Sequence, residues 1–230
     1  MLSLKKIALT ISIVVLSHSF VINSAKSSTI YSAGDDFSGT ANQNGVWSYT
    51  DGSTLLSSSV SVGGVSTWNN TGSLWGQQVS GNTTKVDQEL LNWFTLSPNE
   101  LRLDPEGQTV SATFTAPSSG VYSITGDFAG DFLGEGVNVG IAILDNGSTV
   151  FSNSLLKSLI ISFNLSETLN AGDTIAFEVL GAGGFGGQST ALRAYVTATG
   201  SSTAVPEPTT LAFLAVGLAG LGGRRHYRKA

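Results

Sequence analysis

The sequence has no cysteine, and its only two histidines lie close to the ends of the chain. Without cysteine there is no disulfide to stabilise the fold, so stability must come from a buried core. His18 and His226 both fall in terminal segments with short apolar runs, and residues 27–206 contain neither residue type. The folded part is therefore expected to lack Ser-His-Asp triads, cysteine nucleophiles, histidine-ligated zinc and haem, because each needs one of these two residue types.

Basic residues are almost as scarce between the two ends. Residues 27–206 contain four basic side chains against fifteen acidic ones, a net charge of −11. A surface of this sign repels the phosphate backbone of nucleic acids, whose binding depends on Lys and Arg contacts. Nucleic acid is therefore excluded as a partner, whereas solubility and attraction for divalent cations are favoured.

The chain also lacks an apolar run of the roughly twenty residues that a stable membrane-spanning helix needs. Near the N-terminus, Lys5 and Lys6 precede an apolar stretch at residues 7–16, which is the order of parts in a secretory signal peptide. We predict a signal peptide over residues 1–27.

A second short apolar run occupies residues 209–223 near the C-terminus. It is fifteen residues long, contains four glycines that weaken a helix, and is followed by a basic cluster. A hydrophobic helix this short predicts transient membrane insertion and later removal by an enzyme, rather than permanent anchoring.

The residues around this run resemble the PEP-CTERM sorting signal of Gram-negative bacteria. The order is Val205-Pro206-Glu207-Pro208, then the apolar stretch, then Arg224 and Arg225. The resemblance implies recognition by an exosortase, a membrane thiol peptidase, and export together with exopolysaccharide. It assigns residues 201–230 to a sorting signal and predicts an inner-membrane-anchored precursor that ends at the cell surface or outside the cell.

Between the two signals, residues 28–200 show the period of two that is typical of strands with one buried face. Val110, Ala112 and Phe114 alternate with polar residues, and further alternating stretches follow to residue 198. Asn146-Gly147 is a strong hairpin signal. The pattern predicts an all-β protein with one antiparallel β-sandwich. Only "TKVDQELLNWF" (residues 84–94) favours a short helix.

Three stretches of this region resemble a jelly-roll domain that is common in PEP-CTERM proteins: "ANQNGVWSYTDG", "VSATFTAPSSGVYSITGDFAG" and "LNAGDTIAFEVLGAGGFGGQSTALRAYVT". The resemblance spans most of residues 35–199. It implies a jelly-roll fold and an exported location, and it implies no activity.

Three acids lie four residues apart, at Asp127, Asp131 and Glu135. They could be solvated loop charges, oxygen ligands for calcium, or a carboxylate pair for glycoside hydrolysis. We favour solvated charges, because the stretch lacks the regular ligand series of a calcium loop. No cofactor is predicted, and calcium is the alternative.

Two further patterns were candidates for binding. Trp47 and Tyr49 share a strand face that we expect to point into the core, whereas Trp68 and Trp75 in a polar stretch are the better candidates for stacking on sugar rings. The G-x-G-x-x-G spacing at Gly181, Gly183 and Gly186 predicts no dinucleotide site, because the residues that follow have the pattern of a strand and not of a helix.

These features predict a non-catalytic surface or matrix protein associated with exopolysaccharide. Two alternatives remain open at this point. One is a carbohydrate-binding module with the same fold, which calcium would assist. The other, less favoured, is a glycan-active enzyme that uses carboxylates alone.

Overall fold

The computed structural model describes residues 28–70, 78–83, 88–90, 94–130, 133–181 and 187–199. These residues form strands and connecting loops and contain no helix. None of them therefore provides a helix long and apolar enough to cross a membrane. The predicted signal peptide and C-terminal sorting segment lie outside the described residues.

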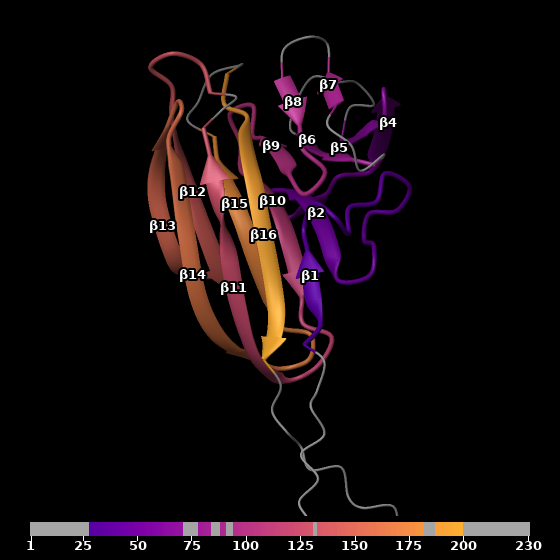
Figure 1. Ribbon diagram of the computed structural model, residues 1–230, viewed down its shortest axis with the longest axis vertical. Helices are drawn as coiled ribbons and strands as arrows, with labels where there is room; N and C mark the ends of the chain where they lie inside the picture. The colour runs from indigo at the N-terminus through magenta and orange to yellow at the C-terminus, as the bar shows by residue number, and fades with distance from the viewer. Residues whose placement is uncertain are drawn as a thin grey trace, which may run out of the picture.

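Two antiparallel sheets pack face to face (Figure 1). The larger, sheet A, has the order β14-β11-β16-β9-β6-β5-β4, and β1 also pairs with β16. Its strands are β14 (Ile160–Leu169), β11 (Gly120–Ala129), β16 (Thr190–Thr199), β9 (Leu101–Asp104), β6 (Gln78–Asn82), β5 (Val65–Asn69), β4 (Ser58–Val62) and β1 (Ile30–Ser32).

The smaller, sheet B, has the order β13-β12-β15-β10-β2-β3. Its strands are β13 (Ser148–Leu156), β12 (Asn138–Asp145), β15 (Thr174–Leu180), β10 (Val110–Thr115), β2 (Trp47–Asp51) and β3 (Thr54–Leu55). From β10 onward the chain passes repeatedly between the sheets, which gives the sandwich its jelly-roll character. The predicted all-β sandwich is confirmed.

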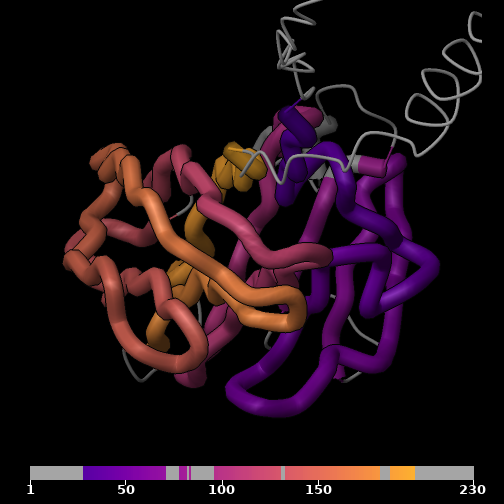
Figure 2. The backbone as a smooth tube through the Cα atoms, turned by 90° about the horizontal axis from the view of Figure 1, so that it is seen from below, coloured from indigo at the N-terminus to yellow at the C-terminus, as the bar shows by residue number. Residues whose placement is uncertain are grey.

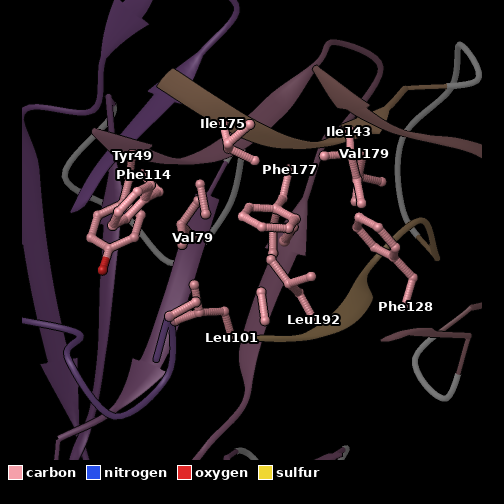
Figure 3. Packing of buried hydrophobic residues seen from close by; sticks show 14 of the residues in the cluster. Tyr49, Val79, Leu101, Phe114, Phe128, Ile143, Ile175, Phe177, Val179 and Leu192 are labelled. Atoms are coloured by element: carbon pink, nitrogen blue, oxygen red, sulfur yellow. The ribbon is translucent and has the colours of Figure 1, made fainter. Parts of the chain in front are cut away.

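The core lies between the sheets and is built by the alternation seen in the sequence. Val110, Ala112 and Phe114 are fully buried on β10, as predicted. Rings from the two sheets meet there: Phe114 of sheet B lies 5.7 Å from Tyr122 of sheet A, and Phe163 of sheet A lies 5.7 Å from Phe177 of sheet B. Figure 3 shows Phe114, Phe128 and Phe177 among the aliphatic side chains of this layer. Aromatic pairs at such distances add stability beyond the apolar area that they bury.

The hairpin predicted at Asn146-Gly147 joins β12 to β13. Asp145 is paired with Ser148, and φ is 48° at Asn146 and 80° at Gly147. Two positive φ values in a two-residue loop are those of a type I′ turn, whose twist matches that of the flanking strands.

A third, two-stranded sheet corrects one prediction. Residues 84–94 were expected to favour a short helix, but their described part belongs to an antiparallel pair, β7 (Gln88–Leu90) and β8 (Phe94–Leu96). Leu96, at the end of β8, packs against Val65 of sheet A. This tertiary contact outweighs the weak local preference for a helix.

The first and last described strands are neighbours. β1 pairs antiparallel with β16, so that Ile30 faces Thr197 and Ser32 faces Tyr195. Both ends of the described chain therefore lie at the same end of the sandwich, as Figure 1 shows.

Candidate functional site

The outer face of sheet A carries the most distinctive group of polar side chains. Asp127 on β11 and Arg193 on β16 lie directly opposite each other in the sheet register. The other outward positions on β11, β14 and β16 are mainly hydroxyl and amide residues: Ser123, Thr125, Ser162, Asn164, Ser166, Thr168, Tyr195, Thr197 and Thr199. On these three strands the outward positions hold one acid, Asp127, and one base, Arg193, which are bound to each other.

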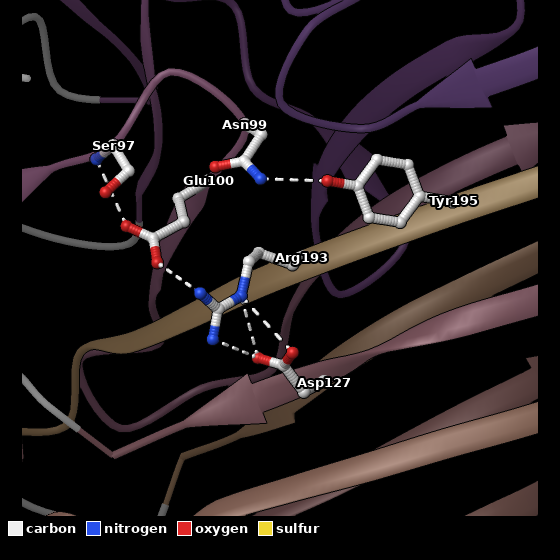
Figure 4. Close-up of polar contacts among 6 residues, drawn as sticks. All are labelled: Ser97, Asn99, Glu100, Asp127, Arg193 and Tyr195. Atoms are coloured by element: carbon white, nitrogen blue, oxygen red, sulfur yellow. Dashed lines mark hydrogen bonds and ion pairs between the residues drawn. The ribbon is translucent and has the colours of Figure 1, made fainter. Parts of the chain in front are cut away.

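Arg193 is the centre of the group (Figure 4). Its Nη2 donates to Oδ1 of Asp127 at 2.8 Å, and its Nε donates to Oδ1 at 3.0 Å and to Oδ2 at 3.2 Å. Nη1 lies 3.5 Å from Oε1 of Glu100. The hydrogen bond to Asp127 raises the pKa of the Arg193 guanidinium, and the charges of Asp127 and Glu100 act in the same direction against its partial burial. The planar fork of the guanidinium fits the carboxylate with two parallel bonds.

The loop before β9 completes the group. The backbone N–H of Ser97 donates to Oε2 of Glu100 at 3.1 Å, which fixes the buried carboxylate beside Arg193. Nδ2 of Asn99 donates to the hydroxyl of Tyr195 at 2.8 Å and holds the half-exposed ring on the sheet. We call Asn99, Glu100, Asp127, Arg193 and Tyr195 the sheet A cluster. It can offer a fixed ring, hydroxyl groups and a neutralised charge pair to a flat polar ligand.

Replacing Arg193 by methionine should lower the free energy of unfolding by about 1–2 kcal/mol, because Asp127 and the buried Glu100 would lose their shared cation. This loss of stability is smaller than for a fully buried ion pair, because the Arg193 side chain is 33% exposed. Urea unfolding measures the change. Arg193→Lys keeps the charge without the fork and should lose less. An unchanged midpoint in Arg193→Met would show that the pair does not contribute to stability.

The three predicted acids are not brought together as far as they are described. Asp127 is bound to Arg193, whereas exposed Glu135 accepts a hydrogen bond from Nζ of Lys157 at 2.7 Å. That hydrogen bond, together with the charge of Lys157, lowers the pKa of the Glu135 carboxyl. Asp131 lies outside the described residues. Among the residues that are described, no group of three or more His, Cys, Asp or Glu side chains is arranged to hold a metal ion.

Only one of the two candidate tryptophans, Trp68, lies among the described residues. Trp68 is only 7% exposed, belongs to the main core cluster, and donates from Nε1 to the carbonyl oxygen of Ser38 at 2.7 Å. Its ring therefore has no exposed face on which a sugar could stack. Trp75 lies outside the described residues. Trp47 and Tyr49 are buried on β2, as predicted.

The described residues around the glycine motif have the secondary structure that the sequence predicted, a strand after the motif. Gly181 closely follows β15, and residues 182–186 lie outside the described part. The segment at Thr190–Thr199 is a strand, β16, and not the helix that a dinucleotide site requires.

One described carboxyl has a raised pKa. Burial raises the pKa of Glu178 on β15, opposite Ser111 and Ala142 in the sheet register. A general acid of a glycosidase needs such a shift together with a second carboxylate at a defined distance. Ser111 and Ala142, its neighbours across the sheet, are not acids, so Glu178 has no carboxylate beside it on the adjoining strands.

Sequence reasoning missed a buried ion pair on sheet A. The Nη2 atom of Arg102 is bound to Asp104 on β9, and its Nε donates to the hydroxyl of Ser189 at 3.0 Å. Burial lowers the pKa of the Arg102 guanidinium, and the charge of Asp104 opposes that change. The spacing of Arg102 and Asp104 could have indicated this pair, because residues two apart on a strand lie on the same face.

Residues 204–229 match the family model of the PEP-CTERM protein-sorting motif. The resemblance seen in the sequence is confirmed, and this sorting motif indicates an exported protein that an exosortase processes. The matched segment includes Val205, Pro206, Glu207 and Pro208 as well as Arg224 and Arg225. The comparison with curated proteins gave no match.

Solved structures with limited similarity include three carbohydrate-binding modules. A family 35 module from Clostridium thermocellum is 15% identical, with a TM-score of 0.34 over 74% of this chain and 98% of the module. The CBM22-1 xylan-binding domain from Paenibacillus barcinonensis is 9% identical, with a TM-score of 0.36 over 74% of this chain and 92% of that domain. A CBM36 module in complex with calcium and xylotriose is 15% identical, with a TM-score of 0.28 over 52% of this chain and 91% of the module. No conclusion about a ligand follows from likeness at this level.

Proposed function

We propose that this protein is a non-catalytic component of the cell surface or extracellular matrix, processed by an exosortase and retained by exopolysaccharide. The observation that carries the proposal is the sorting motif at residues 204–229, on a chain in which the candidate acids Asp127 and Glu135 are each bound to a different basic side chain. In this proposal the exosortase and the secretion machinery are the partners during export. The membrane is a partner only transiently, through the C-terminal apolar segment.

The outer face of sheet A, which carries the sheet A cluster and the Ser, Thr and Asn side chains around it, supports contact with a polysaccharide. Sugar hydroxyls need donors and acceptors, and Ser, Thr and Asn side chains supply both. The ring of Tyr195, held by Asn99, adds an aromatic surface against which a sugar ring can lie. Because Arg193 offsets part of the charge of Asp127 and Glu100, an acidic polymer would meet less repulsion here than beside an unpaired acid.

Retention is tested by co-sedimentation of the processed protein with exopolysaccharide from the producing cells. Tyr195→Ala should reduce the bound fraction about fivefold, as expected for the loss of one aromatic contact. Thr197→Ala on the same face should reduce it less. Thr113→Ala places the same Thr-to-Ala change on the outer face of sheet B and should leave binding unchanged.

Equal binding by all the variants and the wild type would contradict this contact face. The second candidate is a carbohydrate-binding module selective for one glycan. It is favoured by the fixed positions of Asp127, Arg193 and Tyr195, which hydrogen bonds hold on the face of the sheet. A glycan array separates the two, because a selective module binds one class of glycan whereas matrix retention shows little preference. Release of reducing sugar ends that is lost in Asp127→Asn or Glu135→Gln would favour the enzyme alternative.

A further inference from the structure

The outer edge of β14 is an unusually open strand edge. β14 ends the order of sheet A, and it pairs with β11 over ten consecutive residues without a bulge. Proteins commonly block such edges with short strands, bulges, proline or charged residues. β14 is long and has neither a proline nor a bulge, and its one charged residue, Glu167, lies in the inward-facing row near the C-terminal end of the strand.

The other edge strands of sheets A and B are either bulged or shorter than β14. β13 ends sheet B, but its register shifts between Ile143 and Leu144, so that Val150 is an extra, bulged residue. On the opposite side of the sandwich, β3 has two residues and β4 has five. Figure 2 shows the two sides, with β13 and β14 in orange at one and the indigo and purple strands at the other.

The direction of the unpaired backbone groups on β14 follows from one hydrogen bond. The carbonyl oxygen of Leu159 accepts from the N–H of Gly130 at 2.8 Å, so it points toward β11. Backbone groups alternate in direction along a strand. Ile160, Ser162, Asn164, Ser166 and Thr168 therefore direct their N–H and C=O groups to the free edge, and the side chains of all five are exposed.

The charges around this edge indicate what can approach it. Between residues 146 and 166, Lys157 is the only charged residue, in a chain whose residues 27–206 carry a net charge of −11. Two copies of an acidic domain repel each other wherever acids face acids, so they can approach only where charges are absent. Exposed aliphatic surface gathers at the same place: Leu156 and Leu159 are each 45% exposed, and Ile160 is 59% exposed.

We propose that two copies of this chain associate through their β14 strands, antiparallel about a two-fold axis at Asn164, to form one continuous sheet. In this register Asn164 lies opposite Asn164 of the second copy, Ser162 opposite Ser166, and Ile160 opposite Thr168. All five edge residues then exchange backbone hydrogen bonds, as in any antiparallel pair. The interface is isologous, so it closes at a dimer. It also extends the outer face of sheet A across two copies.

The test is the mass of the processed, mature protein, measured by sedimentation across the micromolar concentration range. The wild type should form a dimer. Asn164→Asp places two like charges opposite each other and should weaken the dimer at least about tenfold. Asn153→Asp makes the same change on exposed β13 and should leave the dimer intact. Ser162→Pro removes only an N–H that faces solvent, so it should give a folded monomer.

A wild-type protein that stays monomeric throughout this range would overturn the proposal. So would a dimer that persists in both Asn164→Asp and Ser162→Pro. Dissociation in Asn153→Asp but not in Asn164→Asp would assign the contact to β13 instead. Far-ultraviolet circular dichroism on each variant confirms that the sandwich is retained, so a misfolded variant is not mistaken for a monomer.

Discussion

Replacing Gly126 by alanine should destabilise the domain by about 3 kcal/mol, from backbone strain together with overpacking. The φ angle of Gly126 is 153°, in the region that side chains rarely adopt. A Cβ there would lie 1.9 Å from the carbonyl oxygen of Arg193 and 2.7 Å from the ring of Phe163. The ring of Phe163 occupies the space over this glycine and packs on Phe128 and Phe177.

Gly120 provides the matched control on the same strand. A Cβ added there meets nothing within 4 Å, and its φ is not in the restricted region. Gly120→Ala should therefore leave stability unchanged or raise it by up to about 1 kcal/mol, because alanine has less freedom in the unfolded chain. Urea or thermal unfolding compares the two. Equal stability of the two variants would show that the close approach at Gly126 relaxes at little cost.

Replacing Glu207 by alanine should block processing and leave the precursor in the membrane fraction. Glu207 lies between two prolines within the matched sorting motif. Among residues 200–208, its carboxylate is the one charged group that a peptidase can recognise before the apolar run. Loss of that charge should reduce the released protein by at least about tenfold, the effect of losing one charged hydrogen bond in recognition.

Glu135→Ala is the control for this experiment, because it makes the same change at an exposed position of the folded domain. It should be processed as the wild type is. Immunoblots of membrane and medium fractions, with the mass of the released protein, give the result. Release of Glu207→Ala at normal yield and mass would remove the basis for assigning recognition to this residue.

The strand faces could be predicted from sequence because alternation records which side of a strand is buried. Val110, Ala112 and Phe114 were assigned to the core from the alternation of their neighbours alone, and all three are fully buried. The hairpin at Asn146-Gly147 could also be predicted from local sequence. Its type I′ turn needs a positive φ at both central residues, and asparagine and glycine adopt such angles readily.

The pairing of distant strands could not be predicted in this way. Asp127 and Arg193 are 66 residues apart, and only the order of strands in sheet A brings them together. Trp68 was expected in a polar, exposed stretch. It is buried because β5 is covered on both faces, so the polar residues beside it are buried as well. The composition of a short stretch does not indicate whether other parts of the chain cover both faces of its strand.

The pairing of β1 with β16 has a consequence for the order of folding. Ile30 and Thr197 are partners across the sheet although 167 residues separate them, and β16 also pairs with β11 and β9. Until residues 190–199 have emerged, β1 has no partner and β11 lacks one of its two neighbours. Contacts between such distant residues form slowly. We therefore expect the chain to remain unfolded, and so able to be threaded across a membrane, until its last strand has passed through.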